Sequence, residues 1–505
     1  MDIKQLYELY KQYPCITTDS RDCPEGSIFL ALKGEKFDGN KFAPQALAKG
    51  CKWAIVDTLP ALSEGGKELR TPGENPCAAE TAERGETYPV YDLRAGAAPS
   101  SLREDRGGYL LVDDALLTFK LLAREHRRQF NIPVIGITGT NGKTTTKELV
   151  RAVLSEKYNV LATEGNFNND VGVPKTLLRL RPEHEIAIIE MGASHPGDIK
   201  TLAETAEPTC GLITNVGRAH LQGFGSFEGV VKTKGELYDY LRTREDGLVF
   251  LNADSDELCD MLTDDMWCTP YSIDPDKQYA CISGEVIPHN LPKGEGNSSA
   301  EHVSSSEKQG DVYLRFRWRR PLMELEETGA SQKWHKVQTH LIGDYNIYNA
   351  LAAIAVGINF GVDRKQICHA LENYVPTNNR SQFMQTEHNR LIVDAYNANP
   401  SSMMAALENF AAMSGTSKMV ILGDMRELGE SSLEEHQRIV NYLETMPLQE
   451  VWLVGSEFAR TQTNFRLFPD VEAVKAELQT NCPANRLILV KGSNGTHLYQ
   501  LPELL

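Results

Sequence analysis

The sequence predicts an α/β protein of three domains, and three observations support this fold class. Its 505 residues exceed what a single hydrophobic core usually supports. Strand-like apolar runs alternate with runs of helical spacing through the middle of the chain, as in βαβ units built on a parallel sheet. A second alternation of this kind begins near residue 378. We therefore expect a mixed α/β domain at 1–112, a central parallel-sheet domain at 113–377 and a smaller Rossmann-like domain at 378–505.

The expected first domain contains short elements and one long polar segment. Strand-like runs occupy 27–32 and 53–56, and a stretch rich in Gly, Pro, Glu and Arg follows at about 63–108. That composition is typical of loops, so we interpret this stretch as a loop insertion. Apolar residues then recur at helical spacing over 115–129, directly before the next apolar run.

The two later domains are predicted from their alternating runs. Central strands are expected at 159–162, 185–191 and 211–216, and central helices at 174–180, 199–205 and 229–241. A second polar segment, 294–310, interrupts a β-like region that ends near 342 and precedes an Ala-rich helix at 346–357. Strands of the last domain are expected at 390–395, 418–423, 450–455 and 486–491. Ligands of open parallel sheets bind at the carboxyl ends of the strands. Polar residues stand at those ends, so we expect a site built from several βα loops: Glu190, Asn215, Asp394, Asp424 and Lys491.

The most informative segment is Val134-Ile-Gly-Ile-Thr-Gly-Thr-Asn-Gly-Lys-Thr-Thr-Thr146, where an apolar run ends in a Gly-rich turn that opens a helix. Gly139 and Gly142 let the backbone turn its N–H groups inward, Lys143 can reach phosphates, and the Thr144 hydroxyl is placed to ligate Mg²⁺. The strict G-x-x-x-x-G-K-[ST] spacing is not met, so this is a shorter G-x-x-G-K-T variant. A Gly-rich turn that binds nothing is the alternative, but the flanking strand and helix favour an ATP or GTP site.

Other polar residues have both a functional and a structural interpretation. Glu190 ends an apolar run, where a carboxylate suits Mg²⁺ or caps the next helix. The turn at 165–174 contains Asn168, Asn169 and Asp170, which can bind a polar substrate or simply form the turn. A lone His220 is a weak signal, and composition alone would make Lys234 an exposed helix lysine.

Composition excludes several function classes. A net charge of −17 argues against duplex nucleic acid and anionic membrane surfaces as main partners, because both favour cationic proteins. The ten cysteines form no C-x-x-C pair, so we infer neither a disulfide framework nor a zinc site. No signal core follows Met1 and no apolar run reaches ~18 residues, so we expect a soluble protein that is not exported.

Taken in order, the motifs resemble those of the Mur ligase family over almost the whole chain. The matching segments are 17–21, 31–39, 139–144, 165–174, 190–193, 219–225, 344–350, 394–399, 423–429 and 491–493. The chain departs from the family pattern in its two polar insertions and at Asn494, where relatives can carry a basic residue.

The resemblance implies an ATP-dependent amide ligase of the bacterial cytoplasm. It would join D-alanyl-D-alanine to UDP-N-acetylmuramoyl-tripeptide through an acyl phosphate, as a monomer that binds no nucleic acid and inserts into no membrane. Two Mg²⁺ ions would be held by Thr144, Glu190, His220 and Lys234, the last as a carbamate formed from CO₂. The expected catalytic residues are Lys143, Glu190, His220 and Lys234. ATP would be bound by Gly139, Thr140, Asn141, Gly142, Lys143, Thr144, Thr145, Asn346, Asn349, Arg380 and Asp394. The other substrates would be bound by Ser20, Arg21, Asn168, Asn169, Asp170, Tyr396, Asn397 and Asn399.

Three alternatives stay open at this point. The nearest is another ligase of the same superfamily, which adds an amino acid to a UDP-muramoyl peptide or glutamate to folate. A P-loop module that acts as a nucleotide switch or motor belongs to a different class, and so does a scaffold that binds no nucleotide.

Overall fold

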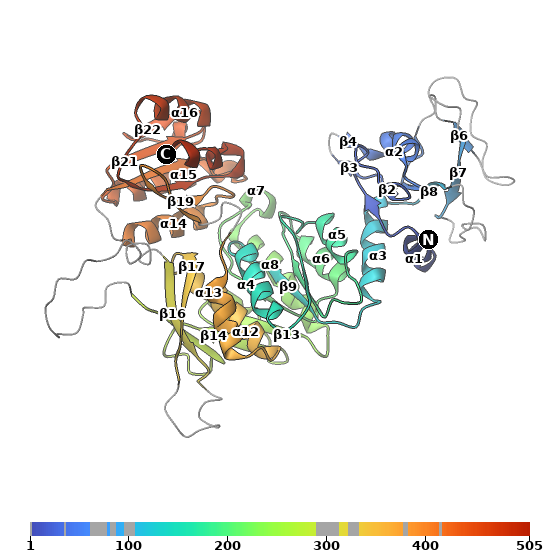
Figure 1. Cartoon of the computed structure of the whole chain (residues 1–505), viewed down its shortest axis with the longest axis horizontal. Coiled ribbons are helices and arrows are strands. Elements are labelled where there is room, and N and C mark those ends of the chain that lie inside the picture. Colours follow the sequence, from blue (N-terminus) through green and yellow to red (C-terminus); the bar gives the residue numbers. More distant parts are fainter. Residues whose placement is uncertain are drawn as a thin grey trace. The chain divides into compact units, whose positions relative to one another are not determined.

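The computed structural model (Figure 1) describes residues 3–34, 37–60, 78–80, 87–94, 107–288, 313–321, 333–376, 382–413 and 417–505. The chain forms two compact units. The first unit comprises 1–131, 164–182 and 205–207, and the second comprises 132–163, 183–204 and 208–505. Within the described ranges, no helix has both the length and the apolar content needed to cross a bilayer.

The first unit is built on a six-stranded sheet with the order β1-β2-β5-β8-β7-β6, in which the β6–β7 pair is antiparallel and the other pairs are parallel. Its strands are β1 (Ile16–Thr17), β2 (Ile28–Leu30), β5 (Trp53–Val56), β6 (Ala78–Glu80), β7 (Thr87–Asp92) and β8 (Gly108–Leu111). A two-stranded ribbon, β3 (Lys33–Gly34) with β4 (Phe37–Asp38), lies beside α2 (Ala43–Lys49) in the sequence. Phe29, Val56 and Tyr109 pack on Ala46 of α2 to form its core.

The interpretation of 63–108 as a loop insertion is wrong for part of that segment. Strand β7 pairs in parallel with β8, and the Tyr91 ring lies 5.4 Å from the ring of Trp53. Two aromatic residues and Val90 lie within the six residues of β7, and their burial outweighs the polar composition around them. Most of the rest of this insertion, and all of 294–310, lie outside the described residues.

Three helices pack together in the first unit: α1 (Ile3–Gln12), α3 (Ala115–Arg127) and α5 (Gly172–Leu177). The Tyr10 hydroxyl donates to the Leu178 carbonyl at 3.1 Å, and the Tyr7 hydroxyl lies 3.0 Å from His126 Nδ1. The structure therefore groups α3 and α5 with the first unit, whereas the sequence-based boundary after residue 112 assigns both to the central domain.

The second unit contains a nine-stranded sheet with the order β10-β11-β9-β12-β13-β14-β15-β16-β17. The pairs from β10 to β15 are parallel, and the last two pairs are antiparallel. These strands are β9 (Val134–Thr138), β10 (Val160–Ala162), β11 (Ile186–Glu190), β12 (Cys210–Ile213), β13 (Leu248–Asn252), β14 (Trp267–Ser272), β15 (Ile282–Val286), β16 (Tyr313–Arg319) and β17 (His335–Ile342).

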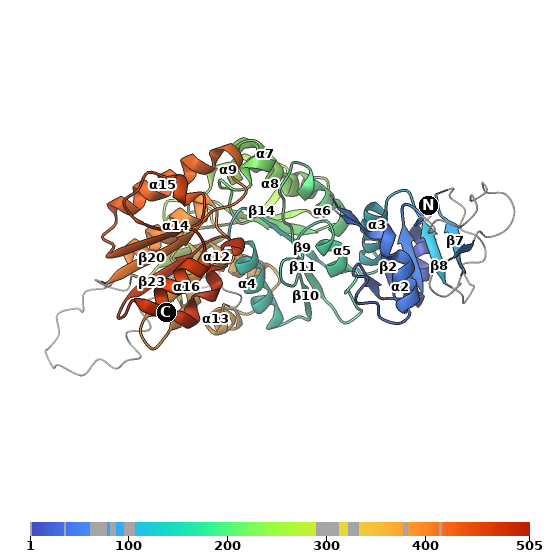
Figure 2. The ribbon, with the colours of Figure 1, turned by 90° about the horizontal axis from the view of Figure 1, so that it is seen from above.

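Helices cover both faces of this sheet, as Figure 2 shows for α8 on one side and α4 with α12 on the other. Ile135 and Ile137 of β9 point into the core formed with α4 and α12. Gly136 between them faces α8, where a Cβ at position 136 would lie 3.1 Å from Leu237 Cδ1. Alternation along the strand thus sends large side chains to one face and allows α8 to approach closely on the other. The helices are α4 (Lys143–Ser155), α6 (Asp198–Ala206), α7 (Leu221–Phe224), α8 (Phe227–Arg242), α9 (Asp256–Asp260), α12 (Asn346–Asn359) and α13 (Arg364–Asn373).

The C-terminal part of the second unit is a Rossmann-like sheet with the order β18-β19-β23-β20-β21-β22, parallel except at β18. Its strands are β18 (Gln382–Gln385), β19 (Arg390–Asp394), β20 (Lys418–Gly423), β21 (Glu450–Val454), β22 (Arg466–Phe468) and β23 (Leu487–Lys491). Helices α14 (Pro400–Ala412) and α15 (Ser432–Thr445) pack on one core of this sheet, and α16 (Val471–Thr480) packs on the other. The expected strands of both later domains are confirmed.

Candidate active site

The phosphate loop joins β9 to α4, and both of its glycines are required by geometry. Gly139 has φ +140°, and a Cβ there would lie 2.0 Å from Thr214 Oγ1. Gly142 has φ +78°, and a Cβ there would lie 2.7 Å from Asn349 Oδ1. Both positions therefore exclude a side chain, by backbone conformation and by contact.

The loop is held against the next strand tip by hydrogen bonds to its backbone. The Asn141 amide donates to Asn215 Oδ1 at 3.0 Å, while Thr214 Oγ1 and Asn215 Nδ2 donate to the Asn141 carbonyl at 2.6 and 3.0 Å. Thr140 Oγ1 accepts from the Gly217 amide at 3.0 Å. These contacts place the loop before any ligand arrives, as a preorganised site requires.

The start of α4 differs from the starts of α8 and α14. Ser226 caps α8 and Asn399 caps α14 with side-chain oxygens, whereas α4 starts at Gly142 without a side-chain cap. The first-turn amides, including those of Lys143, Thr144 and Thr145, have no acceptor within the helix, so they can bind an anion. The Lys143 ammonium lies over the same turn, donating to the carbonyls of Gly139 at 2.7 Å and Thr140 at 3.0 Å.

Thr144 and Glu190 meet at the tips of adjacent strands. The Thr144 hydroxyl lies 3.0 and 3.2 Å from the two Glu190 oxygens, and both residues are buried. The amides at the start of the next helix, those of Gly197 and Lys200, donate to the Glu236 carboxylate at 2.8 Å each, so the cap of that helix is Glu236 and not Glu190. The donor set, one carboxylate and one hydroxyl beside a phosphate loop, fits Mg²⁺. In the described part of the chain, no three His, Cys, Asp or Glu side chains cluster as a ready-made metal site.

Lys234 lies in α8 with only 2% of its surface exposed, which overturns the composition-based expectation of an exposed helix lysine. Its Nζ is 5.5 Å from the centre of the Phe224 ring, and the same ring lies 6.2 Å from that of His220. Burial, and after it the positive charge of Lys143, lower the pKa of Lys234 well below its ordinary value. Lys143 and Lys234 are therefore electrostatic neighbours, and Phe224 links Lys234 to His220.

Asn346 and Asn349 of α12 are buried in a chain of hydrogen bonds behind the loop. Thr146 Oγ1 donates to Asn349 Oδ1 at 3.0 Å, Asn349 Nδ2 to Asn346 Oδ1 at 2.7 Å, and Asn346 Nδ2 to the Ile342 carbonyl at 2.7 Å. The Asn346 and Asn349 side chains thus position α12 against α4.

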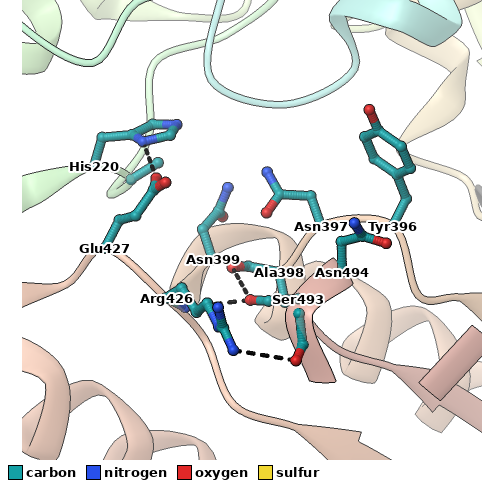
Figure 3. Close-up of a pocket in the computed structure, with 11 residues that line it drawn as sticks. His220, Tyr396, Asn397, Ala398, Asn399, Arg426, Glu427, Ser493 and Asn494 are labelled. Carbon is teal, nitrogen blue, oxygen red and sulfur yellow. Dashed lines mark hydrogen bonds and ion pairs between the residues drawn. The ribbon is translucent and has the colours of Figure 1, made fainter. Parts of the chain in front are cut away.

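A pocket of about 150 Å³ opens between the loop after β12 and three loops of the C-terminal sheet (Figure 3). His220 Nδ1 contacts a Glu427 carboxylate oxygen there, and this hydrogen bond lowers the pKa of Glu427. Both residues have positive φ, +50° and +64°, which non-glycine residues rarely adopt. The pocket is lined by Ala219, His220, Tyr396, Asn397, Ala398, Asn399, Arg426, Glu427, Ser493, Asn494 and Gly495.

Two further predicted residues belong to the C-terminal loops. Asn399 caps α14 through Ser402 and donates from Nδ2 to Asn141 Oδ1 at 2.8 Å, so it touches the phosphate loop. Asp394 accepts from the buried Lys491 ammonium at 2.5 Å. Arg380 lies outside the described residues.

The predicted substrate-binding residues of the first unit make mainly local contacts. Arg21 pairs with Asp19 at 2.8 Å and is largely exposed, and the Ser20 carbonyl accepts from Lys49 at 2.9 Å. Asn169 Oδ1 accepts from the amide of Gly172, the first residue of α5, at 2.8 Å, which agrees with the turn-forming interpretation of that segment. Asn168 and Asp170 flank it, and Asp170 lies 3.6 Å from Lys120.

Sequence reasoning did not select Arg426 or Glu427, although both lie in the Gly423–Gly429 motif. Arg426 and Asn494 both line this pocket, so the pocket contains a cation although residue 494 is neutral. The sequence offered one signal for these two residues, because Arg426 and Glu427 are adjacent charged residues in the loop directly after a buried strand.

Comparisons with known proteins match nearly the whole chain. Three family descriptions match in order: "Mur ligase family, catalytic domain" at 12–92, "Mur ligase middle domain" at 137–357 and "Mur ligase, glutamate ligase domain" at 379–494. The UDP-N-acetylmuramoyl-tripeptide--D-alanyl-D-alanine ligase of Escherichia coli is 31% identical over 97% of this chain and 93% of its own length. The Bacillus subtilis protein of the same name is 28% identical, covering 96% of this chain and 92% of its own.

Solved structures agree with this result. The crystal structure of MurF from Acinetobacter baumannii has a TM-score of 0.74 and 28% identity, covering 99% of this chain and 97% of that one. The MurF ligase from Thermotoga maritima, solved in complex with ADP, has the same fold, with a TM-score of 0.72, 22% identity and coverage of 97% and 96%. The predicted three-domain α/β fold is thereby confirmed, and the chain belongs to the Mur ligase family.

Proposed function

We propose that this chain is an ATP-dependent ligase that joins D-alanyl-D-alanine to UDP-N-acetylmuramoyl-tripeptide during peptidoglycan precursor synthesis in a bacterial cytoplasm. The observation that carries the proposal is the rim formed by Lys143, Thr144 and Glu190, with the buried amine of Lys234 beside it. Similarity over nearly the full length to ligases named for these substrates supports the substrate assignment.

The reaction would proceed in two steps, acyl phosphate formation and amide formation. A carboxylate oxygen of the tripeptide attacks the γ-phosphorus of ATP, so that an acyl phosphate forms and ADP leaves. The D-alanyl-D-alanine amine then attacks the acyl carbon, inorganic phosphate leaves, and the amine loses a proton. Both reactants of the first step are anions, so Lys143 and the first-turn amides of α4 offset the negative charge that gathers on the transferred group.

Thr144 and Glu190 would hold one Mg²⁺, and His220 with Lys234 would hold a second. Bound Mg²⁺ supplies positive charge to the phosphates during transfer. Glu190 is positioned for this role by its backbone amide, which donates to Thr163 Oγ1 at 3.0 Å.

Lys234 is suited to carry a carbamate. Only a neutral amine has the lone pair that bonds to the carbon of CO₂, with release of one proton, and burial beside Lys143 favours the neutral form. The product is an anion on a long arm, which offers oxygen ligands to a hard metal and opposite charge to Lys143.

The remaining roles follow the family resemblance. Asn346 and Asn349 would lie on the adenine side, Arg380 would contact the phosphates and Asp394 the ribose. Ser20 and Arg21 would hold the UDP-sugar. The other substrate contacts would come from Asn168, Asn169, Asp170, Tyr396, Asn397 and Asn399.

Phosphate release from ATP tests this function. We expect release to require both UDP-N-acetylmuramoyl-tripeptide and D-alanyl-D-alanine, with a product mass equal to their sum less one water. Tripeptides ending in diaminopimelate or lysine, compared side by side, identify the accepted acid. Faster release with single amino acids or with folate and glutamate would support another ligase of the superfamily. Release without an acid and an amine would support a nucleotide switch, and failure to bind ATP would support a scaffold.

A further inference from the structure

Arg426 is an exposed residue that lines this pocket, and its guanidinium is held in place by one of the neighbouring loops. It follows the buried strand β20, its backbone amide lies 3.2 Å from Ser493 Oγ, and its Nη2 donates to the Gly495 carbonyl at 3.1 Å (Figure 3). The loop after β23 therefore holds Arg426 twice, at its backbone through Ser493 and at its side chain through Gly495. A guanidinium carries five N–H donors in a planar fork, so the single bond to Gly495 leaves donors that can face the pocket.

Gly495 provides the space for that fork. A Cβ at position 495 would lie 2.4 Å from Arg426 Cζ and 2.5 Å from its Nη1. Gly495 has no left-handed φ, so the absence of a side chain there is explained by the guanidinium and not by the backbone. A methyl group at this position would displace the end of a flexible side chain and leave the fold in place.

The two walls of the pocket carry opposite charges. Glu427, the next residue, turns its carboxylate toward His220, while the Arg426 guanidinium donates to the Gly495 carbonyl (Figure 3). Asn397, Asn399 and Asn494 add neutral hydrogen-bonding groups between these walls. At about 150 Å³ the pocket is smaller than the roughly 300–1,000 Å³ typical of drug-sized ligands. One cation, one carboxylate and a small polar volume suit a short zwitterion.

The Glu427 wall faces the reaction centre. His220 contacts Phe224, which borders Lys234, and Asn399 touches Asn141 of the phosphate loop. A dipeptide whose amine attacks near the phosphate loop would therefore place its carboxylate at the far wall, where Arg426 lies.

We propose that Arg426, seated on Gly495, binds the terminal carboxylate of the incoming D-dipeptide and makes this enzyme select a dipeptide acid. This inference rests on the proposed function. A bidentate pair between guanidinium and carboxylate supplies both the energy and the orientation. Arg426 acts on binding and selection and takes no part in the bond-forming step.

The test compares two amine substrates, D-alanyl-D-alanine and its C-terminal carboxamide, in two enzymes. We expect the native enzyme to prefer the acid by roughly 10- to 100-fold in kcat/KM, the range of a charge-assisted pair. Arg426→Ala should abolish this preference by raising KM for the acid alone, with the KM values for ATP and UDP-muramoyl tripeptide unchanged. Gly495→Ala should weaken the preference in the same direction while Arg426 is still present.

Arg460→Ala is the matched control, because Arg460 is an exposed arginine of the same C-terminal sheet domain that pairs with Glu457 and does not line the pocket. It should keep the native preference. An acid-over-amide preference that survives in Arg426→Ala, or a rise in the KM for ATP or for the tripeptide instead, would overturn the assignment of Arg426. If native protein makes no amide from either dipeptide, the proposed function itself fails, and that result is distinguishable from the others.

Discussion

Two lysines of the middle domain are both almost fully buried, yet their surroundings differ. Lys147 in α4 donates to the Thr163 carbonyl at 2.6 Å and lies 2.8 Å from a Glu148 carboxylate oxygen. Lys234 in α8 faces the Phe224 ring, and its neighbouring charge includes the cation of Lys143. Lys147 therefore has hydrogen-bond and charge partners for its Nζ, whereas the surroundings of Lys234 favour a neutral amine.

The comparison shows that burial of a lysine does not by itself mark a functional site. A buried charge with acceptors and a carboxylate is explained by structure alone. A buried amine beside a second cation, at the rim where a phosphate loop ends, has an environment that costs stability, and such environments are typical of reactive groups. Substitutions at and around Lys147 and Lys234 test whether this difference in surroundings corresponds to a difference in function.

The largest effect is expected from Lys143→Ala, which removes both a phosphate contact and the cation beside Lys234. Amide formation should fall about 10²–10³-fold, the cost of losing one preorganised donor. The midpoint of thermal unfolding should stay near that of native protein, because Lys143 contacts loop carbonyls and no core. Near-native turnover would show that the phosphate loop is misassigned.

Lys234→Ala should also lose activity, by at least the roughly 10- to 100-fold that follows loss of even an indirect metal partner. A small carboxylate added in solution should restore part of it by occupying the vacated ligand position. Lys232→Ala is the control, because Lys232 lies two residues away on the exposed side of α8. After equilibration with ¹³C-labelled CO₂, native protein should show a carbamate NMR signal that is absent from Lys234→Ala. Full activity of Lys234→Ala would contradict the carbamate assignment.

Substitution by methionine should change stability in opposite directions at the two lysines. Lys147→Met leaves the Thr163 carbonyl without its donor and takes one of two cations from Glu148, which still pairs with Arg151, so the free energy of unfolding should fall by about 1–3 kcal/mol. Lys234→Met removes the cost of burying an amine, so the free energy of unfolding should stay equal or rise. Urea unfolding measures both, and equal losses at the two positions would remove the distinction.

The smallest effect concerns a third buried base, His436 of α15. Its Nε2 accepts from the Met425 amide at 3.0 Å, and burial lowers its pKa from 6.5, against the opposing effect of the Ser432 carbonyl. Below pH 6.5 the unfolded chain therefore binds more protons than the folded chain at this residue, so stability rises with pH in that window and is lost as pH falls. Urea midpoints of native protein and His436→Gln between pH 5 and 8 should diverge in slope; parallel curves would show that His436 does not titrate differently in the two states.

Much of the fold and of the site could be predicted because the signals are local. Trp53–Val56 and Lys418–Gly423 are strands with the predicted bounds, since continuous apolar runs between turn residues indicate buried parallel strands. The order Gly139, Gly142, Lys143, Thr144 predicts a phosphate loop because a left-handed turn and a helix start depend on adjacent residues. Glu190 was predicted at the same rim because parallel strands end on one edge of a sheet.

Only the tertiary structure decided which side chains are buried and which distant loops meet. Lys234 looks like any lysine on a helix, and its low exposure arises from the packing of α7 and α8. Arg426 and Gly495 are 69 positions apart in the chain, so the sequence does not show that Gly495 provides the space that the Arg426 guanidinium fills. Strand β7 was missed because its place beside β8 depends on the sheet and not on neighbours in sequence. Local patterns thus determined elements and motifs, while contacts between residues far apart in the chain determined charge state, burial and the shape of the pocket.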